Sequence, residues 1–315
     1  MSAALARYLV SLLPGKNAIM KGGASLPPSL RTKRTVKFLS AVAARAGRPV
    51  DLDTNLGVDR RLHLRIASSK PSLVFGKPQL FLGERSSLDL ALTLVRKSMC
   101  FLDVGAHVGL YVFYLRSRDI SSSPIYFFEP DPTLFARLQE NVARNGFDHI
   151  KGFQVAMAEN TGKTTFFRNK TDDSSGTLVK QDWSQHVLEP IEVDRISFGD
   201  FVTRHGLEHV CAKVDVEGAE ELFLEGAKSD LDRLDYLVIE ILGPAVGRGL
   251  PLRIMQEGNY HAYYINDYDL EHSPAGKYTY AAPFYNWLFC RENPAKLRKL
   301  LQRTRFRVIA CAASQ

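Results

Sequence analysis

Along the middle of the chain, short continuous apolar runs alternate with segments in which apolar residues recur at the spacing of a helix. Five short apolar runs, bounded by polar or turn residues, predict buried strands over 101–104, 125–128, 152–155, 211–214 and 236–241. Between them the apolar residues recur at helical spacing, which predicts helices over about 109–116, 132–145, 198–204 and 219–226. Strands that alternate with helices favour an α/β fold in which helices cover both faces of a mostly parallel sheet.

Two further apolar runs, over 260–265 and 286–290, have no helical crossover between them. We therefore expect these two strands to pair antiparallel at one edge of the sheet. The polar segment 161–182 predicts a hairpin on the surface.

The first predicted strand runs into a turn with the sequence Asp103-Val-Gly105-Ala-His107-Val-Gly109. A buried strand, a glycine turn that lets the backbone approach a ligand, and a following helix are the features of a nucleotide-type cofactor loop. Asp103 is the discriminating residue, because a carboxylate in front of the glycines would repel a pyrophosphate. S-Adenosylmethionine fits better, since it carries an ammonium group and a ribose but no phosphate.

A second acid, Glu129, closes the next predicted strand, 26 residues after Asp103. In doubly wound folds an acid at this point accepts hydrogen bonds from the ribose hydroxyls. Either acid alone would be weak evidence, because glycine turns and strand-end acids also occur in ordinary connections. In this order, and in a strand-helix-strand unit, they favour a cofactor site.

Four blocks of the sequence together resemble the FkbM-type S-adenosylmethionine-dependent methyltransferases. The blocks are 101–109, Phe128-Glu-Pro-Asp-Pro132 with Leu138 and Asn141, Ser174-Ser-Gly-Thr-Leu178, and Lys213-Val-Asp-Val-Glu-Gly-Ala-Glu220. The likeness extends from about Glu84 to Cys290, and the Lys-x-Asp-x-Glu-Gly block is its most specific part. The chain departs from the family pattern at His107, where the family usually carries Asn.

The resemblance implies a class I methyltransferase: a doubly wound, seven-stranded, Rossmann-like sheet with an antiparallel hairpin at its C-terminal edge. It also implies S-adenosyl-L-methionine as the cofactor and O-methylation of a hydroxyl, commonly in a glycan or a secondary metabolite. Of these two acceptors we favour a glycan.

In such a sheet the ligand lies outside the carboxyl ends of the strands, where the strand order reverses. The expected contacts follow the three parts of the cofactor. The candidates are Asp103, Gly105, Ala106, His107 and Gly109 for the methionine portion, Glu129 and Pro130 for the ribose, and Met157 and Ala158 for the adenine face. For His107, a hydrogen-bonded loop residue is a better interpretation than a general base, because it belongs to the cofactor loop.

A hydroxyl becomes a good methyl acceptor when a base removes its proton. Asp215 and Glu217, at the end of the fourth predicted strand, are candidate bases, and Glu240, at the end of the fifth, is a third catalytic candidate. Glu217 could equally serve as an anion at the N-terminus of the next helix, which Gly218 would open. A Mg²⁺ ion held by Asp215 and Glu240 is a competing use of these acids, but no histidine cluster or ligand loop accompanies them and we predict no metal.

Aromatic residues gather near the C-terminal strands, where they suit a sugar ring or a polyketide, although aromatic residues in an edge hairpin more often pack in the core. The cluster consists of Tyr260, Tyr263, Tyr264, Tyr268, Tyr278, Tyr280, Phe284, Tyr285 and Trp287. The segment Asp172-Asp-Ser-Ser175 could contact sugar hydroxyls or form a plain turn.

Two other classes of protein fit parts of the pattern. An NAD(P)-dependent oxidoreductase is disfavoured by the position of Asp103, by the absence of Gly-x-Gly-x-x-Gly spacing and by the lack of a Tyr-x-x-x-Lys-like catalytic pair. A non-catalytic cofactor-binding module would use basic ends of the chain to bind a membrane or a polymer.

Charge divides the chain into three parts. The net charge of +7 is made up of +9 in residues 1–50, −8 in 51–290 and +6 in 291–315. We therefore expect a basic N-terminal extension, a methyltransferase domain over 51–290, and a basic C-terminal helix or tail. The acidic body argues against nucleic acid as a partner.

Both basic ends have helical periodicity. Leucines lie on one helical face before Pro14 and again over 297–301, among basic residues, and the glycines and paired prolines of 15–28 are typical of a linker. Such helices can bind an anionic membrane surface peripherally or pack their apolar stripe on the body.

Nothing in the sequence predicts insertion into or export across a membrane. No apolar stretch approaches the ~20 residues of a membrane helix. The apolar segment 8–13 is too short for a secretory signal and ends at Pro14. Cys100, Cys211, Cys290 and Cys311 lack paired or metal-like spacing, as expected of reduced thiols in a cytoplasmic protein.

Overall fold

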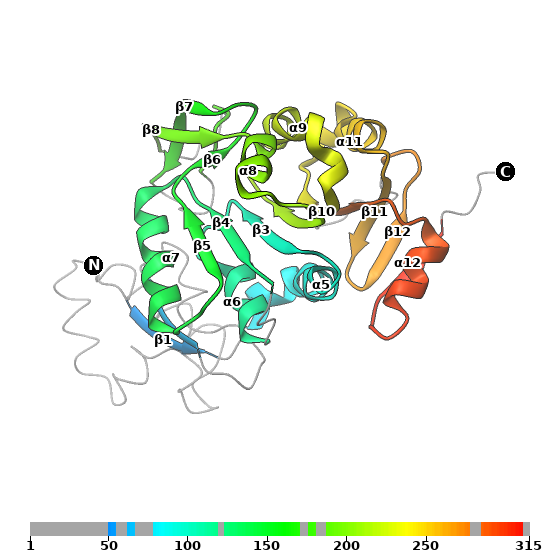
Figure 1. Cartoon of the computed structure of the whole chain (residues 1–315), viewed down its shortest axis with the longest axis horizontal. Helices are drawn as coiled ribbons and strands as arrows, with labels where there is room; N and C mark the ends of the chain where they lie inside the picture. Colours follow the sequence, from blue (N-terminus) through cyan, green and yellow to red (C-terminus); the bar gives the residue numbers. More distant parts are fainter. Residues whose placement is uncertain are drawn as a thin grey trace.

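A nine-stranded sheet forms the centre of the molecule, with the strand order β14-β12-β11-β13-β10-β9-β3-β4-β5 (Figure 1). The computed structural model describes residues 50–54, 62–66, 78–118, 123–170, 176–180, 187–277 and 285–310. The N-terminal extension with its predicted helix and linker, and Cys311, lie outside these residues.

Five parallel strands make one half of the sheet. They are β3 (Cys100–Val104), β4 (Ile125–Phe128), β5 (Ile150–Phe153), β9 (Val210–Val214) and β10 (Leu234–Glu240). β3 lies between β4 and β9, so the strand order reverses beside it, as expected for a doubly wound sheet. All five strands were predicted, although β5 begins two residues earlier than expected.

Helices cover both faces of the sheet (Figure 1). One face carries α5 (Pro78–Val95), α6 (Leu110–Ser117) and α7 (Pro132–Arg144); the other carries α8 (Phe198–His205), α9 (Glu220–Ala227) and α11 (Leu250–Gly258). Each face of the sheet packs against its helices in a separate hydrophobic core. Successive strand residues point into opposite cores: Phe101 and Phe127 lie in the first, and Leu102 and Phe128 lie in the second. The sequence did not predict α5 or α11.

The antiparallel half of the sheet is larger than expected. β11 (His261–Asn266) pairs antiparallel with β13 (Asn286–Cys290), as predicted. β12 (Asp269–His272) and β14 (Arg307–Ile309) then extend the sheet beyond β11, so the prediction of seven strands was too low. Both strands are short, and an ion pair between Arg307 and Asp269 accompanies their pairing.

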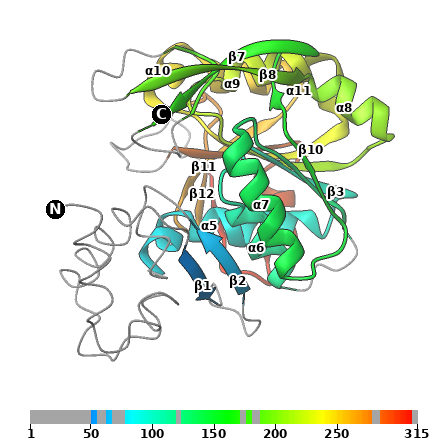
Figure 2. The same cartoon turned by 90° about the vertical axis from the view of Figure 1, so that its left-hand side faces the viewer.

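A small three-stranded sheet, in the order β6-β8-β7, stands beside α7 (Figure 2). It contains β6 (Ala156–Met157), β7 (Gly162–Asn169) and β8 (Leu188–Ile196), and β7 pairs antiparallel with β8. A surface hairpin was expected here, but its second strand lies beyond the predicted segment 161–182. We call β6, β7, β8 and the segment 176–180 the insert.

The remaining short elements connect or flank these layers. β1 (Val50–Thr54) and β2 (Leu62–Ile66) form a separate antiparallel ribbon. The 3₁₀ helix η3 (Lys228–Arg233) follows α9, and α10 (Gly243–Gly247) precedes α11.

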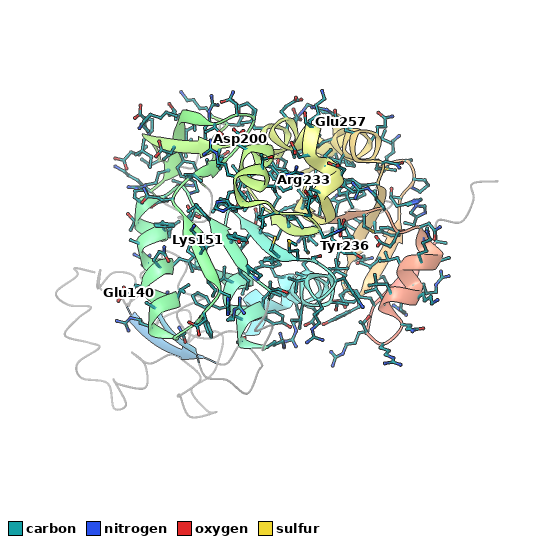
Figure 3. All side chains as sticks on the ribbon, viewed as in Figure 1. Glu140, Lys151, Asp200, Arg233, Tyr236 and Glu257 are labelled. Carbon is teal, nitrogen blue, oxygen red and sulfur yellow. The ribbon has the colours of Figure 1, made fainter. Side chains whose placement is uncertain are left out.

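The C-terminal helix α12 (Pro294–Leu301) packs on the body of the protein. Leu297 and Leu301 are fully buried in the same core as Phe101, and Tyr236 of β10, labelled in Figure 3, donates a hydrogen bond to Glu292 just before the helix (2.9 Å). The apolar stripe of α12 is therefore covered, which leaves its basic residues on the surface.

None of the described helices combines the length and apolar character needed to cross a bilayer.

Candidate active site

A cavity of about 630 Å³ opens where β3, β4 and β9 end. Residues of three kinds line it: backbone and side chains from the strand ends, side chains from the turn before α7, and side chains from the insert. They are Val104, Gly105, His107, Phe128, Glu129, Pro130, Asp131, Leu134, Val155, Ala156, Met157, Phe166, Arg168, Asn169, Gly176, Leu178, Asp215, Val216 and Glu217.

The turn after β3 has little room for side chains. Gly105 adopts φ 77°, and a Cβ there would lie 1.9 Å from the carbonyl oxygen of Asp215. His107 follows with φ 49°, a left-handed conformation in which Asn and His are both enriched. The departure from the family's Asn at this position therefore keeps a residue suited to the turn. Gly109, at φ 81°, is the N-cap of α6.

Glu129 is held by the backbone on both sides of its carboxylate. Its oxygens accept the N–H groups of His107 (2.8 Å) and Asp131 (2.9 Å), and the side chain lies on the cavity wall with only 4% of its surface exposed. Burial raises the pKa of Glu129 to about 7, against the lowering effect of the two N–H groups. Glu129 thus presents a fixed carboxylate whose charge changes near neutral pH.

Lys213 and Asp215 form an ion pair at the end of β9. The Nζ of Lys213 donates to the Oδ2 of Asp215 across 2.7 Å. Burial raises the pKa of Asp215, but the Lys213 ammonium outweighs it, so the pKa is lowered overall. Burial likewise opposes the charge of Lys213, and the carboxylates of Asp215, Asp103 and Glu84 nevertheless raise its pKa. Asp215 is therefore an anion on the cavity wall.

Glu240, at the end of β10, carries a proton next to Asp215. Burial and the neighbouring Asp215 raise the pKa of Glu240, and Glu240 donates a side-chain hydrogen bond to Asp215. Glu240 does not line the cavity. Of these two predicted catalytic residues, the structure places Asp215 at the cavity and Glu240 behind it.

Asp103 lies beneath the glycine turn and does not line the cavity. It is paired in register with Lys213 on the neighbouring strand and is 1% exposed. Among the described residues, neither carboxyl oxygen of Asp103 has a hydrogen-bond partner at standard geometry. Burial raises the pKa of Asp103 to about 6, although the Lys213 ammonium and the nearby N–H of Val112 lower it. Among the other predicted cofactor residues, Ala106, Gly109 and Ala158 also lie off the cavity wall, whereas Gly105, His107, Pro130 and Met157 lie on it.

Glu217 lines the cavity in a left-handed conformation, with φ 50°. The next helix begins at Glu220 rather than at Gly218, and the N–H of Gly218 donates to the carboxylate of Glu220 (2.9 Å). The acid at the helix N-terminus is therefore Glu220, which corrects the expectation for Glu217.

Several residues near the site were not predicted to belong to it. Glu84 of α5 accepts hydrogen bonds from Tyr111 (3.0 Å) and from Asn286 (3.5 Å), and it adds a carboxylate beside Lys213 and Glu240. Arg168 of the insert is another. A helix at 78–95 was the missing signal for Glu84, because without it the sequence does not place residue 84 near the strand ends.

The aromatic cluster near the C-terminal strands is mostly core. Tyr260, Tyr263, Tyr264 and Trp287 are buried, and the hydroxyls of Tyr260 and Tyr263 donate to the backbone carbonyls of Leu231 (2.7 Å) and Glu292 (2.6 Å). Tyr285 is 37% exposed. Tyr278, Tyr280, Phe284 and the segment 172–175 lie outside the described residues.

Within the described residues, no three His, Cys, Asp or Glu side chains form a group that could hold a metal ion.

The cavity suits S-adenosylmethionine on its own features. A fixed carboxylate faces it at Glu129, the backbone of Gly105 lines it while packing too closely on the carbonyl oxygen of Asp215 to leave room for a Cβ, and apolar side chains of the insert line another wall. Glu129 would hold the ribose, the turn 105–109 the methionine portion, and Met157 with the insert the adenine.

Comparisons with known proteins identify the family of the chain. The model of the methyltransferase FkbM domain matches residues 103–307. The 2-O-methyltransferase NoeI of Sinorhizobium fredii is 29% identical over 48% of this chain and 67% of its own length. The hexuronic acid methyltransferase AglP of Haloferax volcanii is 24% identical over 50% of this chain and 62% of its own.

Among solved structures, a S-adenosylmethionine-dependent methyltransferase from Agrobacterium tumefaciens covers 77% of this chain and 68% of its own, with a TM-score of 0.40 and 8% identity. That score is too low to establish a common fold by itself. The family match alone spans well over half of the chain, which excludes the oxidoreductase and non-catalytic interpretations. The chain belongs to the FkbM family of S-adenosylmethionine-dependent methyltransferases.

Proposed function

We propose that the enzyme O-methylates a hydroxyl of a glycan, with a secondary metabolite as the other acceptor class. S-Adenosylmethionine supplies the methyl group as an electrophile. The names of the two curated relatives, a 2-O-methyltransferase and a hexuronic acid methyltransferase, support a sugar-type acceptor. They concern parts of those proteins, so the acceptor of this chain stays a proposal.

The single observation that carries the chemistry is the position and charge of Asp215. Its carboxylate lies on the cavity wall, ionised by its contact with Lys213. In the proposed reaction Asp215 takes the hydroxyl proton as the oxygen bonds to the methyl carbon and the carbon–sulfur bond breaks. Glu240, protonated behind Asp215, keeps the carboxylate in place by a hydrogen bond. Glu217, on the same wall, is the alternative base.

The experiment compares Asp215→Asn with Asp232→Asn, an exposed control. Methyl transfer is followed by mass spectrometry on a panel of methyl glycosides that includes neutral sugars and a hexuronic acid. We expect Asp215→Asn to lower turnover by about 10²–10⁴-fold, as loss of a general base does, while S-adenosylhomocysteine binds with near-normal affinity in calorimetry. We also expect EDTA to leave turnover unchanged, because a free carboxylate needs no metal.

Near-normal turnover of Asp215→Asn would move the role of base to Glu217 or Glu240. Activity that EDTA removes and Mg²⁺ restores would assign Asp215 and Glu240 to a metal instead. Failure of every sugar in the panel, with cofactor binding intact, would point to a secondary metabolite.

We further propose that the enzyme acts in the cytoplasm and that its basic ends contact anionic membrane surfaces peripherally. The exposed Lys296, Arg298 and Lys299 on α12 support an electrostatic contact, since the leucines of that helix are buried. Cosedimentation with phosphatidylserine vesicles should be lost at high salt and reduced by deletion of residues 1–14. Equal binding to neutral vesicles would contradict this proposal.

A further inference from the structure

The insert supplies one wall of the cavity. Phe166, Arg168 and Asn169 come from β7, and Gly176 and Leu178 come from the segment that follows it. Gly176 packs so closely on Phe166 that a Cβ would lie 2.4 Å from its ring, and Thr177 pairs with Phe167 through two backbone hydrogen bonds. This part of the wall therefore moves as a unit with β7.

Arg168 joins that unit to the turn before α7. Its Nε donates to the Oδ2 of Asp131 (2.6 Å) and its second nitrogen donates to the Oδ1 (3.3 Å), a bidentate geometry. The Asp131 side chain is 7% exposed and that of Arg168 is 27% exposed. A carboxylate oxygen of Glu189 in β8 lies 3.7 Å from the remaining guanidinium nitrogen, Nη1. Partial burial and two hydrogen bonds distinguish this pair from an ordinary surface ion pair.

Asp131 connects this ion pair with the predicted ribose ligand. Its carboxylate caps α7 by accepting the N–H groups of Thr133 (2.7 Å) and Leu134 (3.2 Å), while its own N–H donates to Glu129 (2.9 Å). One residue thus fixes the helix start, the position of Glu129 and the position of Arg168. A shift of the insert would therefore also displace the carboxylate of Glu129, the predicted ribose ligand.

The base of the insert is attached elsewhere. Thr161, before β7, donates to Asp200 of α8, which Figure 3 labels, and Arg195 of β8 pairs with Glu159. Neither of these side-chain contacts involves Arg168. Arg168 is one of the eight paired positions of β7 and β8, but that pairing is made by the backbone, which a change of side chain leaves in place. Loss of Arg168 should therefore release the cavity side of the insert without unfolding it.

We propose that Arg168 is a positioning residue for the cofactor, whose ion pair with Asp131 holds the apolar wall of the insert against the nucleoside end of the cavity. The role rests on the cofactor assignment and is independent of the acceptor and of Asp215. Arg168 acts on the cofactor through Phe166, Leu178 and Glu129, so its loss weakens cofactor binding and spares the methyl-transfer step.

The experiment is a double-mutant cycle of Arg168→Gln and Asp131→Asn, read by calorimetry with S-adenosylhomocysteine and with adenosine. Asn is as good a helix cap as Asp, so Asp131→Asn removes the charge while keeping the start of α7. Lys163→Gln is the matched control, because it removes an exposed ion pair with Glu192 on the same two strands. Thermal denaturation checks that every variant is folded.

We expect each single variant to bind both ligands about tenfold more weakly, the double variant to be no worse than either single, and Lys163→Gln to match the wild type. Arg168→Lys should recover only part of the affinity, because an ammonium cannot bind both oxygens in the same geometry.

Wild-type affinity in a folded Arg168→Gln variant would overturn the proposal. Additive losses in the double variant would also overturn it, since Arg168 would then act apart from Asp131. If S-adenosylhomocysteine weakened but adenosine did not, the wall would not serve the nucleoside. A wild-type protein that binds neither ligand would instead refute the cofactor assignment.

Discussion

The two ends of the cavity are built in different ways. At the Asp215 end, formed by Gly105, His107, Asp215, Val216 and Glu217, the wall consists of strand ends, left-handed backbone and an ion pair set against the central sheet. At the insert end, the wall consists of side chains on a small separate sheet, among them Phe166 and Leu178, and its cavity side is joined to the turn before α7 by one bidentate ion pair. The first end is fixed by packing and charge, whereas the second depends on where the insert rests. We therefore expect changes at the Asp215 end to affect folding, turnover and cofactor binding, and changes at the insert end to affect cofactor affinity but not turnover.

Removing the charge of Lys213 should have the largest effect. Lys213→Met leaves Asp215, Asp103 and Glu84 without the buried ammonium that faces them, and breaking such a pair costs about 3 kcal/mol or more of unfolding free energy. In the variant, burial raises the pKa of Asp215 and is opposed only by the hydrogen bond from Glu240 and by His107, so this pKa should be higher than in the wild type. Protonation should then restore part of the stability as the pH falls from 8 to 5. Urea denaturation at both pH values measures this.

Lys163→Met serves as the control, because Lys163 and Glu192 form an exposed pair that contributes little. A loss in Lys213→Met that is equal at pH 8 and pH 5 would mean that the carboxylates are not the cause.

Adding one methyl group at Gly105 should be the next most harmful change. Gly105→Ala places a Cβ against the carbonyl oxygen of Asp215 in a residue with φ 77°. Backbone strain of this kind costs about 1–3 kcal/mol, so affinity for S-adenosylhomocysteine should fall by roughly tenfold to hundredfold. Gly247→Ala is the control, since no atom lies within 4 Å of its added Cβ. Normal affinity and stability of Gly105→Ala would show that the turn can move away from β9.

The same contrast explains what the sequence could predict. The Asp215 end and Glu129 follow from short motifs, because Gly105, Glu129 and Asp215 each come directly after a buried strand, and parallel strands bring their carboxyl ends to one edge. Their burial was not predictable, so Asp103 was expected at the ligand but lies beneath the turn.

The rest of the site depends on pairings between distant residues. Arg168 contacts Asp131 across 37 residues, and Glu84 contacts Asn286 across 202; no local pattern marks either pair. The two strands missing from the predicted sheet, β12 and β14, have only four and three residues, too few for a periodic signal. Tertiary packing decides such elements, not local propensity.

Glu129, between the two ends, should make cofactor affinity depend on pH. Its pKa is raised to about 7 by burial, so its ionised fraction grows as the pH rises from 6 to 8. The carboxylate accepts ribose hydroxyls better than the acid does, and affinity for S-adenosylhomocysteine should rise by up to ~10-fold over this range. Glu129→Gln should bind S-adenosylhomocysteine weakly at both pH 6 and pH 8. Glu140→Gln is the control, because the Glu140 side chain, labelled in Figure 3, is 40% exposed, and this variant should keep the wild-type pH dependence of affinity. A pH-independent wild type would remove Glu129 from the ribose site.

The smallest effect is expected from the apolar wall itself. Leu178→Ala removes part of a side chain that lines the cavity and packs beside Phe166 and Val193. The lost apolar contact is worth about 1 kcal/mol, so affinity for S-adenosylhomocysteine should fall by roughly fivefold, and turnover at saturating cofactor should not change. Val179→Ala is the matched control, because Val179 is the next residue, is 38% exposed and does not line the cavity. Steady-state kinetics with varied cofactor separate the two quantities. If Leu178→Ala lowered turnover at saturation as much as affinity, the wall would also position the reacting groups, and the division between the two ends of the cavity would not hold.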